Sequence, residues 1–270
     1  MPELPEVETT LRGIEPHIIG KTVKFVIVRQ SRLRWPVSPD LSKSVTGKKI
    51  NSIARRAKYL LFSTDTGRIM VHLGMSGSLR ITNDQKTPKK HDHIDIIFED
   101  RTVLRYHDPR RFGSVFWIPK GRSHSLIDGL GPEPFSDGFD GRYLYQLSRG
   151  RKAAVKLFVM NSKVVVGVGN IYANESLHRA GIRPDREAGA VSLKRYETLS
   201  LEIKKVLIDA IQRGGTTLRD FVREDGSPGY FKQRLLVYGR GNKPCRNCGS
   251  GLRETRLGNR TTIFCVRCQR

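Results

Sequence analysis

The spacing of apolar residues changes along the chain, and each change marks a different kind of structure. Near the N-terminus, Val7, Leu11 and Ile14 recur at helical spacing, which predicts a helix over residues 3–19. Between about residues 21 and 117 the apolar residues come instead in short runs separated by turns. These runs include residues 23–28, 59–62, 68–73, 93–98 and 103–106. Strands at this density, without helices between them, predict a β-sandwich or barrel.

The second half of the chain returns to a helical period. Residues 118–138 are rich in glycine and proline and predict a linker between domains. The clearest helix beyond it follows Ser192, a candidate N-cap, and is stopped by Gly214 and Gly215. Its expected buried face consists of Tyr196, Leu199, Ile203, Val206, Leu207 and Ala210. The predicted order is therefore a helix, a β-rich domain, a linker, a helical domain and a cysteine-containing tail.

Length and charge narrow the class of protein. A chain of 270 residues is long enough for two domains, and no stretch reaches the roughly 18 apolar residues that span a bilayer. The acidic, proline-broken N-terminus is unlike a signal peptide, so we expect a soluble, cytoplasmic protein. Forty-nine lysines and arginines against 26 acids give a net charge of +23, which is typical of a protein with a polyanionic partner. Without a strongly amphipathic cationic helix, nucleic acid is favoured over a membrane surface.

All four cysteines lie near the C-terminus, as two C-x2-C pairs separated by sixteen residues. They are Cys245, Cys248, Cys265 and Cys268. This spacing is typical of a four-thiolate zinc site in a ribbon of paired strands. Two disulfides or a redox pair are the alternatives, but the expected cytosolic location and the symmetry of the pairs favour zinc. Four sulfur ligands leave no open position for water, so we expect one structural Zn²⁺ that does no chemistry.

The first six residues, MPELPE, carry the most informative candidate chemistry. Removal of Met1 would leave the ring nitrogen of Pro2 as a secondary amine, with a pKa of roughly 7.7–8.0 rather than the roughly 10.4 of a lysine. Such an amine can attack a sugar aldehyde carbon and form a covalent iminium. Glu3 lies beside it as a candidate proton donor, and Glu6 follows one helical turn later. The alternative is a structural arm, in which prolines and acids start a helix.

Further blocks follow the N-terminal motif in a fixed order. They are RRAKYLL at 55–61, HLGMSG at 72–77, DPRRFG at 108–113, VGVGNIYA at 166–173 and the four-cysteine tail. This ordered set, with residues 2–16, resembles the formamidopyrimidine-DNA glycosylase family of bacterial base-excision repair over essentially the whole chain. The resemblance implies an α+β multidomain protein. Its expected domains are a catalytic β-sandwich with flanking helices (1–133), a helical helix–two-turns–helix DNA-binding domain (134–235) and a zinc finger (236–270).

The resemblance also implies a reaction and a partner. The expected activity is that of a bifunctional DNA glycosylase and AP lyase, which excises 8-oxoguanine and formamidopyrimidines from duplex DNA through a Schiff base on Pro2. Glu3 would assist sugar-ring opening, and β- and then δ-elimination would cut the strand. DNA would lie in the cleft between the two halves of a monomer that is associated with the bacterial nucleoid. Met1 must be removed, because otherwise the Pro2 nitrogen is an unreactive amide.

Three more residues match catalytic positions of that family. Lys58 matches the lysine that assists base chemistry and β-elimination, although a solvated or phosphate-binding lysine is the alternative. Arg260 matches the zinc-finger arginine linked to δ-elimination. Because an arginine does not readily donate a proton, clamping the departing phosphate is its preferred role. Glu6 is expected to orient the Pro2 amine or to relay protons.

Other matches concern DNA binding. Met75, Arg110 and Phe112 match the residues that fill the hole left by an extruded base, and core packing is the alternative for Met75 and Phe112. The residues that match positions near DNA phosphates are His91, Arg110, Arg151, Lys156 and Asn170. Asn170 is also expected at a helix N-terminus, as part of an anion site or as a plain N-cap, and both roles can hold at once. A mobile loop over residues 216–238 would cover the extruded base.

Two other functions compete with this interpretation. An endonuclease VIII-type enzyme for oxidised pyrimidines would share the proline and the zinc finger, but the PELPE start and the Met75, Arg110 and Phe112 set favour the purine branch. A non-catalytic protein that binds damaged DNA would explain the charge and the ribbon equally well. The presence of Pro2, Glu3 and Lys58 argues against it. A metal at His91, Asp92 and His93 is not expected, because no further ligand completes such a site.

Overall fold

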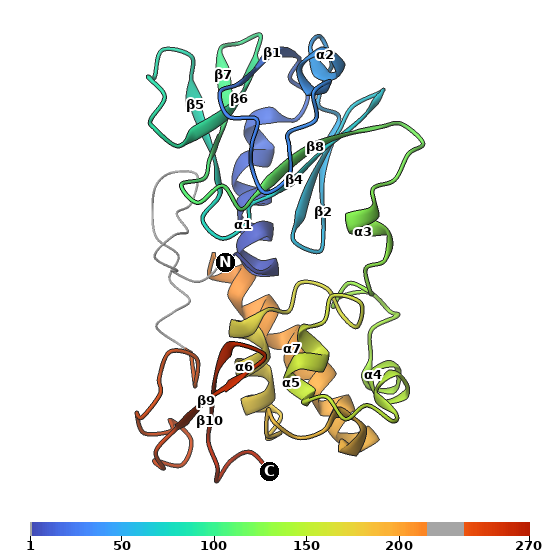
Figure 1. Cartoon of the computed structure of the whole chain (residues 1–270), viewed down its shortest axis with the longest axis vertical. Helices are drawn as coiled ribbons and strands as arrows, with labels where there is room; N and C mark the ends of the chain where they lie inside the picture. Colours follow the sequence, from blue (N-terminus) through green and yellow to red (C-terminus); the bar gives the residue numbers. More distant parts are fainter. Residues whose placement is uncertain (1, 215–234) are drawn as a thin grey trace. The chain divides into compact units, whose positions relative to one another are not determined.

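The computed structural model describes residues 2–214 and 235–270. The chain divides into two compact units, of which the first extends to Asp128 and the second includes residues 129–212 and 235–270. Figure 1 colours the first unit from blue to green and ends the second in red at the C-terminus. Within these ranges, no helix combines the length and the hydropathy needed to cross a membrane.

The first unit is built on eight strands. They are β1 (Val23–Val28), β2 (Ser52–Arg56), β3 (Tyr59–Ser63), β4 (Gly67–His72), β5 (Ser78–Asn83), β6 (Asp92–Phe98), β7 (Thr102–His107) and β8 (Ser114–Pro119). One antiparallel sheet has the order β1-β6-β7-β5, and the other has the order β2-β3-β4-β8. The two sheets confirm the predicted β-sandwich, and β2, β5 and β8 add to the apolar runs seen in the sequence.

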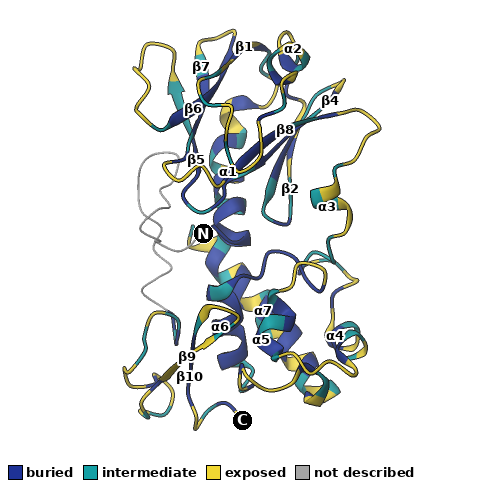
Figure 2. Ribbon diagram, viewed as in Figure 1, coloured by how far each residue is buried: buried dark blue, intermediate teal, exposed yellow. Residues whose placement is uncertain are grey.

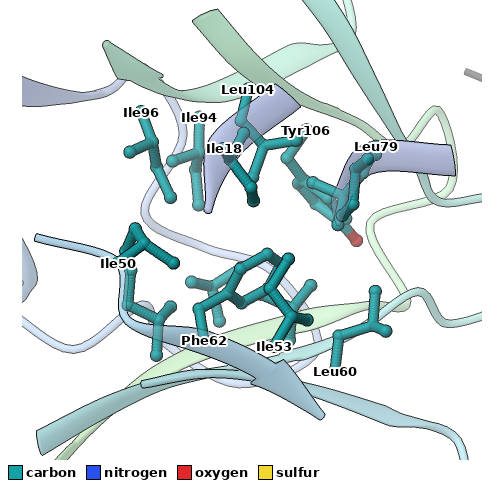
Figure 3. Packing of buried hydrophobic residues seen from close by; sticks show 14 of the residues in the cluster. Ile18, Ile50, Ile53, Leu60, Phe62, Leu79, Ile94, Ile96, Leu104 and Tyr106 are labelled. Atoms are coloured by element: carbon teal, nitrogen blue, oxygen red, sulfur yellow. The ribbon is translucent and has the colours of Figure 1, made fainter. Parts of the chain in front are cut away.

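The core of this unit lies between the two sheets. Figure 3 shows Ile94, Ile96 and Leu104 pointing toward Phe62 and Leu60 across the sandwich. Burial of each such side chain stabilises the fold by about 1.5–3 kcal/mol. The helices α1 (Leu4–Ile18) and α2 (Leu41–Val45) belong to the same unit. The N-terminal helix contacts strands of both sheets, so one hydrophobic core holds its position relative to the sandwich.

The predicted N-terminal helix is confirmed, and its boundaries have clear causes. Pro5 stands in the first turn, where a missing N–H costs nothing, and Gly20 adopts a φ of +80° just beyond the end. Its apolar stripe, which includes Val7, Leu11 and Ile14, is buried as expected. Figure 2 shows the buried parts of α1 in dark blue and its exposed parts in yellow.

The predicted linker contains more structure than its composition indicated. Strand β8 continues to Pro119, and a short helix, α3 (Ser125–Asp128), follows it. Leu126 and Ile127 of this helix pack against the outer face of the second sheet, on a small cluster that includes Met70 and Ile118. Glycine and proline mark turns, but they do not exclude a helical turn that has an apolar face to bury.

The second unit is mostly helical. Its elements are α4 (Gly141–Ser148), α5 (Val155–Met160), α6 (Asn170–Arg179), the 3₁₀ turn η1 (Ala188–Ala190), α7 (Leu193–Gln212), β9 (Arg253–Leu257) and β10 (Arg260–Phe264). The long predicted helix is confirmed as α7, and the buried face named from the sequence is buried in the structure. The β9–β10 ribbon belongs to this unit together with the helices. The bounds of the three domains expected from the sequence remain a prediction.

Helix α6 is the most enclosed element of the second unit. All residues from Ile171 to His178 are buried, and the helix contacts α5, α7 and β10. A helix that is buried on every side must bury its polar side chains too, and these need hydrogen-bond partners. The partners of these polar residues bring the functional groups of the second unit together.

Candidate functional site

The N-terminal residues of the motif are buried at the start of α1. Pro2 is buried, Glu3 is 3% exposed and Glu6 is fully buried. Glu3 is the N-cap, and Glu6 completes a capping box in which one carboxylate oxygen accepts the backbone N–H of Glu3 at 2.8 Å. The Glu6 carboxylate therefore fixes the peptide next to Pro2. Met1 lies outside the described residues, so its removal remains a prediction.

An ion pair ties α1 to the turn that carries Lys58. Arg55 donates from Nε to Glu8 of α1 at 2.9 Å and from one terminal nitrogen to the carbonyl of Ala57 at 3.0 Å. The turn between β2 and β3 is tight, since Ala57 has a φ of +55°. Lys58 follows in this turn and is half-buried. Through Arg55, the helix that begins beside Pro2 and the Lys58 turn are held in one arrangement.

His72 connects the Lys58 turn with the loop that carries Met75. Burial, followed by the charges of Lys58 and Arg34, lowers the pKa of His72 to about 4. The ring is therefore neutral near pH 7, and its Nδ1 accepts the backbone N–H of Gly74 at 3.0 Å. The ring also packs against Tyr59, with the centroids 4.8 Å apart. His72 is thus close to the charge of Lys58 and also accepts a hydrogen bond from the start of the Met75 loop.

The loops that carry Met75 and Phe112 are joined by one buried carboxylate. Asp108 is fully buried and accepts hydrogen bonds from three donors. They are Ser76 Oγ at 2.7 Å, the Tyr106 hydroxyl at 3.0 Å and the Gly113 N–H at 2.9 Å. Burial and the Asp108 charge raise the pKa of Tyr106 well above its usual value, so its hydroxyl remains a donor. Asp108 therefore fixes both loops by accepting hydrogen bonds from each.

The residues expected to fill the vacated base position lie at the tips of these loops. Phe112 is 41% exposed, so the core-packing alternative does not hold for it, and Met75 is partly exposed. The guanidinium of Arg110 lies over the Phe112 ring, 4.9 Å from its centroid. The two loops approach closely at Gly74, where a Cβ would overlap the main chain of Phe112 and Gly113. An exposed ring on a rigid loop can act as a wedge between bases.

His91 lies beside the same loops. It is partly exposed, its ring is about 6 Å from the rings of His93 and His107, and its carbonyl accepts the Asp108 N–H. Its neighbours already have protein partners. His93 Nε2 bonds to the Asp108 carbonyl, and Asp92 accepts from Arg80, His107 and the Lys89 N–H.

Arg151 and Lys156, two expected phosphate contacts of the second unit, differ in their exposure to solvent. Arg151 is exposed, whereas Lys156 is fully buried. The Lys156 ammonium donates to the Thr261 carbonyl at 3.0 Å and to the Thr262 hydroxyl at 2.6 Å. Lys156 therefore binds residues near the start of β10 in this structure. The match to positions near DNA phosphates did not indicate this role.

Asn170 also holds the ribbon. Its side-chain amide donates to the Thr261 carbonyl at 3.1 Å. It is the first residue of α6, and Gly169 is the N-cap, so the plain N-cap alternative for Asn170 is wrong. The preceding glycine adopts the extended N-cap conformation and leaves the Asn170 side chain to bond elsewhere. The position remains next to the positive end of the helix dipole.

Arg260 is the first residue of β10, directly after the ribbon turn. Gly258 and Asn259 both have a positive φ, as two-residue hairpin turns require. The Arg260 side chain is exposed, one residue before the Thr261 carbonyl that Lys156 and Asn170 grip. The arginine at the ribbon turn is therefore placed by hydrogen bonds from two helices.

The four cysteines form one cluster at the base of the ribbon. Their Sγ atoms all lie within 4.8 Å of one another, and two pairs are 3.9 and 3.5 Å apart. A tetrahedral zinc with Zn–S bonds of about 2.3 Å requires sulfurs about 3.8 Å apart, so the donor set and its spacing fit one structural Zn²⁺. It is the one such cluster of metal-binding side chains found in the described ranges.

Comparisons with known proteins identify the family. A model of the formamidopyrimidine-DNA glycosylase N-terminal domain matches residues 1–115, and a model of that family's H2TH domain matches residues 130–222. Formamidopyrimidine-DNA glycosylases of Stutzerimonas stutzeri and Methylococcus capsulatus are 57% and 56% identical, with both chains of each pair fully covered. The chain belongs to the formamidopyrimidine-DNA glycosylase family.

Solved structures of the family have the same fold. The MutM (Fpg) protein of Thermus thermophilus is 35% identical with a TM-score of 0.88, over 99% of this chain and 98% of that one. A Lactococcus lactis Fpg variant in complex with Fapy-dG-containing DNA is 33% identical with a TM-score of 0.92, and a MutM bound to carbocyclic 8-oxo-G DNA is 34% identical with a TM-score of 0.91. Both alignments cover 99% of each chain.

The sequence analysis overlooked several residues that hold this family's motifs in place. Hydrogen bonds of Asp108, Ser76, Glu8 and Arg55 fix the motif loops, and all four residues lie inside the motif segments that the sequence offered. An acidic residue at the start of the DPRRFG block was the available signal, but only the fold reveals that it is buried. Of the expected capping loop, residues 216–234 lie outside the described residues.

Proposed function

We propose that this protein is a bifunctional DNA glycosylase and AP lyase that excises oxidised purines from duplex DNA. The observation that carries the proposal is the buried Pro2–Glu3–Glu6 arrangement, tied through Glu8 and Arg55 to the Lys58 turn. Burial penalises the charge of a carboxylate, so two buried acids beside a candidate nucleophile are typical of a functional site. The Fapy-dG and 8-oxo-G complexes of the related structures support this substrate class.

The first step is the exchange of one bond at the sugar for another. With Met1 removed, the Pro2 nitrogen attacks C1′, and the glycosidic bond breaks as the base leaves with the bonding electrons and takes up the proton that the Pro2 nitrogen loses. Glu3 donates a proton to the sugar ring oxygen, the ring opens and the nitrogen lone pair completes a C1′ iminium. Glu6 fixes the peptide between Pro2 and Glu3, so that amine and acid stay adjacent.

The second step uses the iminium as an electron sink. It acidifies the C2′ proton, whose loss expels the 3′ phosphate, and a second elimination expels the 5′ phosphate. Lys58 is suited to take part in proton transfer because it lies next to the neutral His72 and on the turn tied to α1. Arg260 is suited to hold a departing phosphate, since its guanidinium offers paired donors and stays charged.

Access to the base is provided by the two loops that carry Met75 and Phe112, which we call the wedge loops. Phe112 and Met75 would occupy the space left by the extruded base, and Arg110 would face the remaining strand. His91, Arg151 and the start of α6 at Asn170 are further candidates for phosphate contacts. A net charge of +23 supports a monomer that binds duplex DNA and is thereby associated with the nucleoid.

Borohydride trapping tests this proposal. A duplex with one 8-oxoguanine opposite cytosine is incubated with the protein and reductant, and the adduct is mapped by mass spectrometry. We expect an adduct on Pro2 of protein that lacks Met1. An otherwise identical protein whose Pro2 nitrogen is blocked by an uncleaved N-terminal extension is the control, and it should give none.

The other outcomes identify the competing functions. An adduct formed only on an oxidised-pyrimidine duplex would indicate the endonuclease VIII type. Tight binding without an adduct on either duplex would indicate a non-catalytic damage-binding protein. In the same assay Pro2→Gly keeps an amine but forms a less favourable iminium, so strand nicking at the wild-type rate would contradict the nucleophile assignment.

A further inference from the structure

Helix α6 presents three polar side chains to the ribbon, each four residues after the last. Asn170 and Asn174 hold the main chain of β10, the latter by accepting the Ile263 N–H at 2.9 Å. The third, His178, ends with its Nε2 atom 3.6 Å from the Sγ atom of Cys245. Residues at this spacing lie on one face of a helix, so the face that grips the ribbon continues to the metal cluster.

The histidine is enclosed at this contact. Its side chain is buried at 2% exposure, and Cys245 is buried at 3%. The other ring nitrogen, Nδ1, is buried and has no hydrogen-bond partner among the described residues. The contact is therefore not a surface encounter but a packed junction between α6 and the ribbon.

The two nitrogens decide where the ring proton lies. A metal-bound cysteine is a thiolate, which can only accept a hydrogen bond. A proton on Nδ1 would be buried without an acceptor, whereas a proton on Nε2 points at sulfur. The environment therefore favours the Nε2–H tautomer, which donates to Cys245. The backbone N–H of Asn247 lies 3.4 Å from the same sulfur.

We propose that His178 is a positioning residue of the zinc site, which donates a hydrogen bond to the Cys245 thiolate and strengthens zinc binding. Zinc with four thiolates carries a net charge of −2, and a buried N–H donor offsets part of that charge. His178 is not itself a ligand, because four sulfurs already complete the tetrahedron. The bond also links the metal to the helix whose first residue, Asn170, grips the ribbon near Arg260.

The test is the zinc affinity of the purified, DNA-free protein, measured by competition with a chelator. His178→Phe keeps a flat ring but removes the donor, and we expect zinc affinity to fall about 10- to 100-fold. His178→Gln restores an N–H near the Nε2 position and should recover most of the affinity. His17→Gln, at an exposed position in the first unit, is the matched control and should have no effect.

Two results would overturn the proposal. One is an unchanged affinity in His178→Phe; the other is an equal loss in His178→Gln and His178→Phe, which would make the effect one of packing. A measurement on the unaltered zinc-loaded protein covers the case in which a variant does not fold. Nitrogen NMR of the His178 ring should detect a proton on Nε2 and none on Nδ1, and the opposite tautomer would refute the donor role.

Discussion

The two units hold their functional groups by different physical means. In the first unit, a large apolar sandwich supports loops that are fixed locally by Asp108, His72 and the Glu8–Arg55 ion pair. In the second, a buried polar helix face and a metal cluster hold a small ribbon with few apolar residues. The loops of the first unit tolerate the loss of a bond because the sandwich beneath them remains, whereas the ribbon of the second unit depends on the metal because the ribbon's own core is small.

Zinc removal should produce the largest difference in behaviour between the two units. Structural zinc sites contribute about 10–16 kcal/mol in small zinc-finger domains, so chelation should unfold the ribbon and abolish specific binding of lesion DNA. The sandwich contains no part of the cluster and should keep its near-UV circular dichroism. Circular dichroism and DNA-binding titrations before and after chelation test this. A metal-free protein that binds lesion DNA normally would contradict the dependence of the ribbon on zinc.

The next largest effect is expected at Asp108. Asp108→Asn replaces an acceptor of three hydrogen bonds by an amide that also has donors to satisfy, which should cost roughly 2–4 kcal/mol of unfolding free energy. The loss should be confined to the wedge loops, since the sheets keep their core. Denaturant unfolding and single-turnover assays measure both consequences.

A comparison of two substrates provides the control for Asp108→Asn. Excision of 8-oxoguanine, which requires the vacated position to be filled, should fall more than cleavage of a preformed abasic site. Equal losses on both substrates would mean that Asp108 acts on the whole unit rather than on its loops.

The sequence predicted the units better than it predicted how their sites are held. Periodicity identified α1 and the buried face of α7, because apolar spacing is a local property of each element. The burial of Asp108 and Lys156 depends on contacts between segments far apart in sequence. Lys156, for example, donates to Thr261 more than a hundred residues away. The match to family positions near DNA phosphates made Lys156 an expected phosphate contact, and only the fold reveals that it binds β10.

Acid should weaken the first unit through His72. Above about pH 6.5 the ring is neutral in both states and contributes no pH dependence. As the pH falls toward about 4, the unfolded chain takes up a proton that the folded ring does not, so stability falls by about 1.4 kcal/mol per pH unit, or roughly 3 kcal/mol in all. His72→Asn keeps an acceptor for the Gly74 N–H and removes this titration.

Urea unfolding of both proteins at pH 7 and pH 4.5 isolates the His72 contribution. Asp92 and Asp95 also have lowered pKa values, because hydrogen bonds and nearby cations outweigh burial, and their contribution is likewise lost in acid. These residues are unchanged in His72→Asn, so the difference between the two proteins belongs to His72. If the unfolding free energy of both proteins fell equally with pH, His72 would not be a cause of the acid sensitivity.

The smallest effect on stability is expected at Phe112, where we expect one of the largest effects on excision. Phe112 is 41% exposed and contributes little to the core, so Phe112→Ala should change the unfolding free energy by no more than about 0.5 kcal/mol. It removes the ring over which Arg110 packs and the proposed wedge between bases. Excision of 8-oxoguanine should fall, while Phe112→Leu should retain part of the activity. A stable Phe112→Ala protein with normal excision would show that the exposed ring is not the wedge, and a strongly destabilised one would place it in the fold rather than on the DNA.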